Sequence, residues 1–372
     1  MLRVAPAIRD PLTGGGHTRC TLAHMMSDER LRQLASTILD EQTPAFALRA
    51  ELGLLTDLLR DHATVRIEPT EVRGDGETFT SSGLALSPTM AGRCADDIVR
   101  TVVFARGVQQ AIQEVRVAHP DRPTHLLYAG CGPYAVLALP SMALFGPDEL
   151  QVTLLDIHEA SVDSARTVID ALGLSGRIRA YEAVDACHYE VLADRPPDIL
   201  LSETMNVCLK KEPQVPIARH LLAQAPLATL IPESVRVDAY LVDVSKEFSF
   251  LGNNRSKLGN EAAEPVPPER DRLFLGTVFE LNAATITEWT DLSDDRLPAA
   301  SIHIPHSLEG RYTPMLLTTV TVHRDYVLRA YDSGLTIPKP IPYDGAIRGG
   351  DTLEFHYELG SHPGLVCDVT RA

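Results

Sequence analysis

The sequence has no long apolar run, no paired-cysteine motif and no excess of basic residues, and each absence excludes a class of protein. No stretch reaches the roughly 18–20 consecutive apolar residues that a membrane-spanning helix needs. The N-terminal region lacks the compact apolar core of a secretory signal peptide. We therefore expect a soluble globular protein.

The balance of charge disfavours nucleic acid as a partner. The chain carries 34 Lys and Arg against 50 Asp and Glu, a formal net charge of −16, whereas a nucleic-acid binder needs a basic face for the phosphates. Such acidity suits a cationic substrate, although it is also common among soluble proteins. The six cysteines are scattered without a CxxC pair, which indicates reduced thiols and a cytoplasmic protein.

The chain of 372 residues has room for two domains. Residues 1–26 contain three successive glycines, and we expect them to be disordered or to precede the true start codon. Residues 27–84 are expected to form a helical N-terminal extension, because leucines recur there at helical spacing. This extension is either a docking or dimerisation element or a cap over the active site. The two main domains are expected over 85–232 and 233–372.

Strands and helices alternate in the first main domain, which is the pattern of a doubly wound, Rossmann-like α/β fold with a parallel sheet. Its long first helix has an apolar face that Arg100 interrupts, and on helix statistics alone such an arginine belongs to the surface. The helices are predicted over 95–118, 134–144 and 160–172, and the strands over 125–129, 152–155, 177–181, 198–201 and 227–231.

After Pro232, short β-rich runs separated by Gly, Pro and Asn predict an all-β domain. A polar excursion over 245–272 interrupts these runs, and it is too long for a plain hairpin loop. The predicted strands cover 235–244, 273–281, 316–322, 326–330, 353–357 and 365–369.

A glycine loop and two acids follow the first three strands of the alternating domain. The loop Gly130-Cys131-Gly132 follows the first strand, and glycines let a backbone approach a ligand closely. Asp156 ends the second strand, where an acid accepts hydrogen bonds from ribose hydroxyls, and Asp185 follows the third. The pyrophosphate-binding pattern GxGxxG is incomplete, so we predict a nucleoside cofactor without a pyrophosphate, with S-adenosylmethionine as the first candidate.

Two carboxylates, Glu203 and Glu212, follow the fourth strand and lie nine positions apart. An acid/base pair, a metal site, a clamp for a cation and two solvated loop residues are all open readings of such a pair. No cluster of His or Asp accompanies them, which disfavours a metal. A clamp for a guanidinium fits better, because that group is planar, stays charged and presents five N–H donors.

The segment Ser202-Glu203-Thr204-Met205, with Glu212 after it, resembles the double-glutamate loop of the protein arginine N-methyltransferases. The likeness covers roughly residues 85–370, and 97–101 resembles the family segment whose arginine pairs with the carboxylate of S-adenosylmethionine. The resemblance therefore gives Arg100 a function. It implies catalytic roles for Glu203 and Glu212, and cofactor contacts for Arg100, Gly130, Cys131, Gly132, Asp156, Ile157, Val184 and Asp185.

The family resemblance also implies an architecture and a reaction. An S-adenosylmethionine-binding domain would precede a β-barrel-like domain, with 245–272 as the dimerisation arm of a homodimer. The expected reaction is methyl transfer to a guanidino nitrogen. The two glutamates would draw the positive charge toward two nitrogens and leave a lone pair on the third.

The sequence departs from the family pattern at two places. Tyr128 stands where an acid is common before the glycine loop, which bears on how the methionine part of the cofactor is bound. Thr313-Pro314-Met315 stands where the family carries Thr-His-Trp, so the substrate-side His and Trp are missing. We therefore expect a small guanidine, free L-arginine first, in place of a peptide. The bacterial enzyme that methylates free arginine on the streptozotocin pathway also resembles this family, which makes a natural-product pathway the expected setting.

Three other functions stay open. One is a protein arginine methyltransferase that acts on Arg-Gly-rich tails. Another is a nicotianamine-synthase-like aminobutyl transferase, because the GCGP of residues 130–133 is similar to the first loop of that group. The last is a non-catalytic homologue, which is disfavoured because Arg100 and both glutamates are present.

Overall fold

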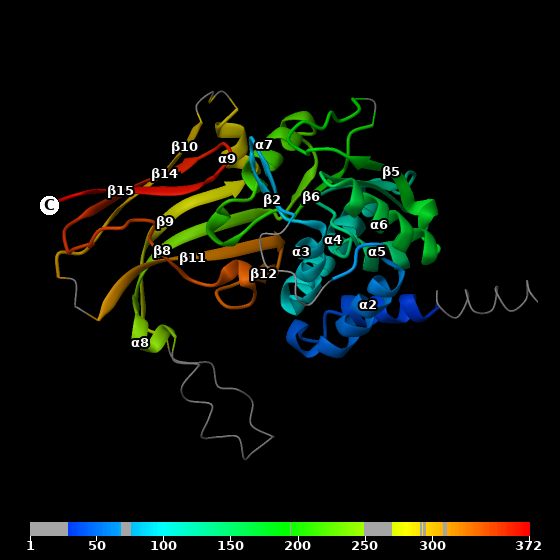
Figure 1. Ribbon diagram of the computed structural model, residues 1–372, viewed down its shortest axis with the longest axis horizontal. Helices are drawn as coiled ribbons and strands as arrows, with labels where there is room; N and C mark the ends of the chain where they lie inside the picture. The colour runs from blue at the N-terminus through cyan, green and yellow to red at the C-terminus, as the bar shows by residue number, and fades with distance from the viewer. Residues whose placement is uncertain are drawn as a thin grey trace, which may run out of the picture.

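The structure is a computed structural model that describes residues 29–67, 76–193, 195–248, 270–290, 292, 295–307 and 311–372. An α/β lobe carries the N-terminal helices, and a lobe of long strands carries the C-terminus (Figure 1). Residues 1–26 and most of 245–272 lie outside the described residues, so the disordered start and the dimerisation arm stay predictions. In the described part of the chain, no helix is both long enough and apolar enough to cross a membrane.

Five parallel strands form the sheet of the α/β lobe, in the order β5-β4-β3-β6-β7. The chain starts at the centre with β3, moves outward to β5, and then passes β3 again to build the other side. The strand order therefore reverses between β3 and β6, which confirms the predicted doubly wound sheet. The strands are β3 (Thr124–Ala129), β4 (Leu150–Asp156), β5 (Ile178–Ala183), β6 (Ile199–Ser202) and β7 (Thr229–Ile231).

Three helices pack on this sheet. Helix α4 (Ile98–Ala118) contacts β3, β6 and β7, α6 (Glu159–Ala171) contacts β4 and β5, and α7 (Gln214–Gln224) contacts β6. The helix predicted over 134–144 is shorter, because only α5 (Leu139–Leu144) is helical. Ala135 has a left-handed φ of 47°, which a right-handed helix does not accept.

The N-terminal extension is only partly helical. Residues 29–39 and α2 (Arg49–His62) are helices, and α2 contacts α4 and α6. Arg106 of α4 donates to the carbonyls of Ile38 and Thr43 at 3.0 and 2.8 Å. The end of the extension, which we predicted to be part of a helical segment, forms a hairpin. It consists of β1 (Thr78–Thr80) and β2 (Gly83–Ala85), with α3 (Pro88–Arg93) after it.

The second lobe contains two antiparallel sheets, ordered β12-β11-β8-β9 with β13 on β11, and β10-β14-β15. Phe279 of β9 stacks on Tyr357 of β14 with ring centroids 4.8 Å apart, so the sheets pack face to face. No strand pair joins them among the described residues, so the predicted β-barrel-like closure is not confirmed. The elements are β8 (Ser234–Asp243), α8 (Val244–Glu247), β9 (Arg272–Asn282), α9 (Ala283–Glu288), β10 (Arg296–His303), β11 (Tyr312–His323), β12 (Tyr326–Leu328), β13 (Lys339–Pro340), β14 (Thr352–Glu358) and β15 (Gly364–Thr370).

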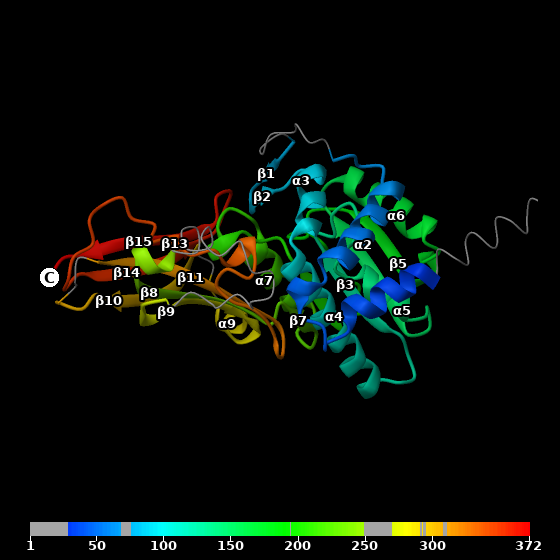
Figure 2. The same cartoon turned by 90° about the horizontal axis from the view of Figure 1, so that it is seen from below.

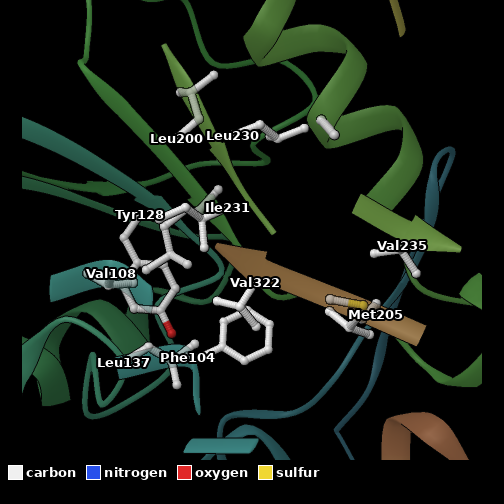
Figure 3. Close-up of a cluster of buried hydrophobic side chains, with 14 of the residues drawn as sticks. Phe104, Val108, Tyr128, Leu137, Leu200, Met205, Leu230, Ile231, Val235 and Val322 are labelled. Carbon is white, nitrogen blue, oxygen red and sulfur yellow. The ribbon is translucent and has the colours of Figure 1, made fainter. Parts of the chain in front are cut away.

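The two lobes share one hydrophobic core. Val322 of β11 lies beside Phe104 of α4 and below Ile231 of β7 in the close-up of this core (Figure 3). A Cβ added to Gly107 would lie 2.6 Å from Cγ1 of Val322, so the glycine lets strand and helix meet. The β lobe is thus packed directly on the helix that carries Arg100, and the turned view places the two lobes side by side (Figure 2).

A buried cluster of ion pairs joins the two ends of the predicted excursion 245–272. Glu247, at the end of α8, is fully buried and accepts hydrogen bonds from Arg270 Nη1 at 3.0 Å, Arg272 Nε at 2.8 Å and the Tyr331 hydroxyl at 2.6 Å. Burial raises the pKa of Glu247, but the hydrogen bonds from Arg272 and Tyr331 and the charges of both arginines outweigh burial, and the net pKa is lowered.

We expect Glu247→Gln to lower the free energy of unfolding at pH 7 by about 3 kcal/mol, because two partly buried guanidinium groups lose their counter-charge. The pKa in the folded state lies below the unfolded value of about 4.3, so the carboxylate stabilises the fold at higher pH. This contribution is lost as the pH falls through the folded-state pKa. Urea unfolding at pH 7 and at about pH 3 measures it; a difference between variant and wild type that is equally large at both pH values would contradict the assignment.

Candidate active site

The carboxyl ends of β3, β4, β5 and β6 open into one cavity of about 440 Å³. It lies where the strand order reverses between β3 and β6, which is the usual ligand site of doubly wound sheets. The structure brings all ten predicted site residues to its wall, from five separate segments of the chain. They are Arg100, Gly130, Cys131, Gly132, Asp156, Ile157, Val184, Asp185, Glu203 and Glu212.

The glycine loop after β3 requires glycine at Gly130 and favours it at Gly132. Their φ angles are 72° and 62°, in the left-handed region. A Cβ added to Gly130 would lie 2.3 Å from Cγ2 of Thr204, so the loop can touch the double-glutamate loop only without a side chain there. Burial raises the pKa of the Cys131 thiol well above its ordinary value, so this cysteine is part of the wall and not a nucleophile.

Two acids stand at the ends of β4 and β5. Asp156 accepts hydrogen bonds from the backbone N–H groups of Gly132 and His158, both at 2.9 Å, and the Val184 N–H donates to the Asp156 carbonyl at 2.9 Å. Asp156 and the segment Val184–Asp185 are therefore neighbours. An ionised carboxylate accepts about four hydrogen bonds, so Asp156 retains acceptor capacity for ligand hydroxyls.

Arg100 lies in the first turn of α4, whose N-terminus is capped by Asp97 with a bond of 3.2 Å to the Arg100 N–H. The side chain is buried, its Nη1 donates to the Cys94 carbonyl at 3.2 Å, and its Nη2 forms an ion pair with Glu203. Its Nε is buried and has no hydrogen-bond partner among the described residues. A buried guanidinium with a spare donor is suited to a further anionic partner.

The double-glutamate loop has an unusual backbone. Cys208, Leu209 and Lys211 have φ angles of 57°, 55° and 74°, and each such residue costs of order 1–3 kcal/mol. The β lobe holds this conformation: Thr318 Oγ1 accepts from the Cys208 N–H at 3.2 Å, and the Tyr357 hydroxyl donates to the Leu209 carbonyl at 2.7 Å. The β lobe therefore fixes the segment that carries the second glutamate.

Gln214, which the sequence reasoning missed, joins the two ends of this loop. It is buried at the start of α7, two positions after Glu212. Its Oε1 accepts from the Thr204 N–H at 3.0 Å, and its Nε2 donates to the Ser202 carbonyl at 3.1 Å. The signal available in the sequence was a glutamine only two positions after a predicted catalytic acid. It positions Glu203 and Glu212 without lining the cavity.

We expect Gln214→Leu to lower kcat about tenfold, because Thr204 and Ser202 lose buried hydrogen bonds and the loop loses its fixed geometry. Affinity for the predicted cofactor, S-adenosylmethionine, should change far less, since the predicted contacts of Arg100 and Asp156 are untouched. Steady-state kinetics and calorimetry measure the two effects. Gln214→Glu keeps the acceptor for the Thr204 N–H but loses the donor to the Ser202 carbonyl, so it is not a neutral control. An unchanged kcat in Gln214→Leu would contradict the positioning role.

The hairpin β1–β2 covers one side of the cavity, which it lines with Thr80, Leu84 and Ala85. The hydroxyl of Thr78 lies 3.0 Å from Nε2 of His158, and the Leu84 N–H donates to the Lys211 carbonyl at 2.8 Å. By contrast, no residue of 29–62 lines the cavity. The prediction that the N-terminal helices cap the active site is therefore wrong, and the hairpin β1–β2 covers the cavity instead.

Thr313-Pro314-Met315 does not lie at the cavity, so its expected place on the substrate side is wrong. These residues belong to β11 and pair with Val242, Leu241 and Tyr240 of β8. Met315 is buried in a small separate apolar cluster with Val242. The β lobe instead contributes Gly334, Leu335, Ile337 and Lys339 to the cavity wall.

The arrangement can hold a cation and an anion side by side. Two buried carboxylates line the cavity from the double-glutamate loop, and a buried guanidinium lines it from α4. No group of three or more His, Cys, Asp or Glu is placed to hold a metal ion in the part of the chain that the structure describes. Burial raises the pKa of Tyr128 far above its ordinary value, so the Tyr128 hydroxyl stays neutral in the wall.

No model of a protein family and no curated protein matches the chain. Among solved structures, the PRMT1 enzyme–prozyme heterotetrameric complex of Trypanosoma brucei with AdoHcy is 15% identical, with 76% of this chain and 93% of that chain covered and a TM-score of 0.48. An open conformation of protein arginine methyltransferase 10 of Arabidopsis thaliana is 12% identical, with 75% and 92% covered and a TM-score of 0.46. Likenesses this distant carry no argument, so the fold rests on the strand order and the function on the cavity.

Proposed function

We propose that the protein is an S-adenosylmethionine-dependent N-methyltransferase that acts on a guanidino nitrogen. The observation that carries the proposal is the convergence of Glu203 and Glu212 on the cavity that the glycine loop also lines. The two residues are 9% and 8% exposed, so their carboxylates are largely removed from water, where they attract a cationic substrate more strongly than surface carboxylates would. A guanidinium offers donors to both carboxylates at once.

The residues at the other end of the cavity fit S-adenosylmethionine. Arg100 would bind its carboxylate with the Nε–H that has no partner among the described residues, and Asp156 would accept from the ribose hydroxyls. Val184 and Asp185 would lie against the adenine, and the glycine loop 130–132 would lie beside the methionine part. When bound, the cofactor would supply an electrophilic methyl group on a sulfonium.

The glutamates would act by position and charge. Each would hold one guanidino nitrogen and draw the positive charge toward it, which leaves a lone pair on the third nitrogen. Such orientation and fixed charge provide most of the acceleration in this kind of reaction. Arg100 keeps Glu203 in place through their ion pair, and the hydrogen bonds from Thr318 and Tyr357 keep the segment before Glu212 in place.

Within this proposal, free L-arginine is the preferred substrate and an Arg-Gly-rich protein is the other candidate. The grounds from the sequence no longer support this choice, because neither 313–315 nor the N-terminal helices line the cavity. The choice now rests on the charges beside Glu212, where Lys210, Lys211 and Lys339 line an adjoining cavity.

The test is incubation with S-adenosylmethionine and either L-arginine or an Arg-Gly-rich peptide, followed by identification of the nucleoside product. Methyl transfer leaves S-adenosylhomocysteine, whereas aminobutyl transfer leaves methylthioadenosine. We expect S-adenosylhomocysteine in amounts equal to the methylated guanidine. Methylthioadenosine as the product would overturn the proposal in favour of aminobutyl transfer.

A further inference from the structure

A second cavity of about 570 Å³ adjoins the first. The residues that line both cavities are Leu84, Leu86, Asn206, Val207, Glu212 and Lys339. A molecule whose guanidinium lies between Glu203 and Glu212 can therefore extend its other end into this second cavity. The groups that line it decide what that end can be.

Lysine is rare in this protein, and three of its five lysines line the second cavity. The sequence has five lysines among its 34 basic residues, at positions 210, 211, 246, 257 and 339. Lys210, Lys211 and Lys339 all line the second cavity. None of the three forms an ion pair with any residue that the structure describes, and all three are exposed to solvent.

The ammonium groups of Lys210 and Lys339 act on Cys208, which lines the same cavity. Burial raises the pKa of the Cys208 thiol, while the hydrogen bond from Thr318 and the ammonium groups of Lys339 and Lys210 lower it. Glu77 and Glu212 are the acids of the same wall. With Glu212 committed to a guanidinium, three cations face one carboxylate, so the cavity favours an anion.

Lysine also suits a site beside the two glutamates better than arginine would. An arginine here would present a guanidinium of its own to Glu212, as Arg100 already does to Glu203. An ammonium is a point charge that pairs with a carboxylate without the planar fork of the substrate group. Lysines can thus attract an anion while they compete less than arginines would with the substrate guanidinium for Glu212.

We propose that Lys210, Lys211 and Lys339 form a subsite for a carboxylate at the far end of a short guanidino substrate. The proposal rests on the function given above, and it makes these lysines specificity-determining residues. A free α-amino acid such as L-arginine carries the matching carboxylate. An Arg-Gly-rich peptide brings amide groups and further positive charge to the same place, so it is disfavoured.

The test compares L-arginine with L-argininamide, which has the same shape but no carboxylate. We expect kcat/KM of the wild type to favour L-arginine by about tenfold or more, as for the loss of one charge-assisted contact. In the double variant Lys210→Met/Lys339→Met the preference should fall to about twofold or less, mainly through KM. Lys246→Met is the matched control, because Lys246 lies on α8 outside the cavity and should leave the preference unchanged.

Binding by calorimetry, in the presence of S-adenosylhomocysteine, gives a second measurement that needs no turnover. Equal affinity of the wild type for L-arginine and L-argininamide would overturn the subsite, as would a preference that survives in the double variant. Methylation of L-argininamide or an Arg-Gly-rich peptide as efficiently as L-arginine would overturn the subsite and leave guanidino transfer standing. Absence of transfer to every guanidine would instead overturn the proposed function, and the binding comparison would still decide the subsite.

Discussion

Glu203→Gln and Glu212→Gln are each expected to lose about 10²-fold or more in kcat while they still bind S-adenosylmethionine. Glutamine keeps the shape of the side chain but removes the charge that holds the guanidinium and polarises it. Both residues are buried in the same cavity, so water replaces the missing charge poorly.

The two glutamate variants should differ in their affinity for the cofactor. Glu203 is paired with Arg100, and Glu203→Gln releases that guanidinium for the carboxylate of the cofactor. We therefore expect Glu203→Gln to bind S-adenosylmethionine at least as tightly as the wild type. Wild-type kcat in both variants, measured at saturating cofactor, would refute the clamp.

Arg100→Ala is expected to weaken cofactor binding by about 10²-fold, because a buried charge-assisted contact with the carboxylate is lost. The same change leaves Glu203 buried without its counter-charge, which costs about 3–5 kcal/mol of stability. Asp156→Ala should weaken binding as well, because it removes the acceptor for the ribose and frees the Gly132 N–H.

The double variant Arg100→Ala/Glu203→Gln separates the two effects of the arginine. It removes the unpaired carboxylate, so its stability should recover toward that of the wild type, while the cofactor affinity should stay low. Calorimetry and urea unfolding measure these quantities. Cofactor affinity that is unchanged in both Arg100→Ala and Asp156→Ala would remove the cofactor assignment.

Local patterns in the sequence were sufficient to predict the α/β sheet and the residues at its edge. The central strands are short, largely apolar runs, and Asp156 and Glu203 stand directly at strand ends. Because parallel strands end at one edge, residues far apart in the chain could be predicted to meet there. The predicted roles of these residues remain predictions, although the structure brings the residues together.

Features that depend on long-range pairing could not be predicted in this way. The hairpin β1–β2 has strands of only three residues, and contacts with His158 and Lys211 hold it. Thr313–Met315 was misplaced because its position depends on its register with β8. The lysines at 210, 211 and 339 meet only because β13 lies beside the double-glutamate loop, which no spacing along the chain reveals.

The most direct test of the central claim is the position of the transferred group. The protein would be incubated with S-adenosylmethionine that carries a trideuterated methyl group and with L-arginine, and the product fragmented in a mass spectrometer. The account predicts one trideuteromethyl group on a guanidino nitrogen, and its loss in Glu212→Gln. Label on the α-amino group or the carboxylate, or cofactor binding without transfer to any guanidine, would contradict it.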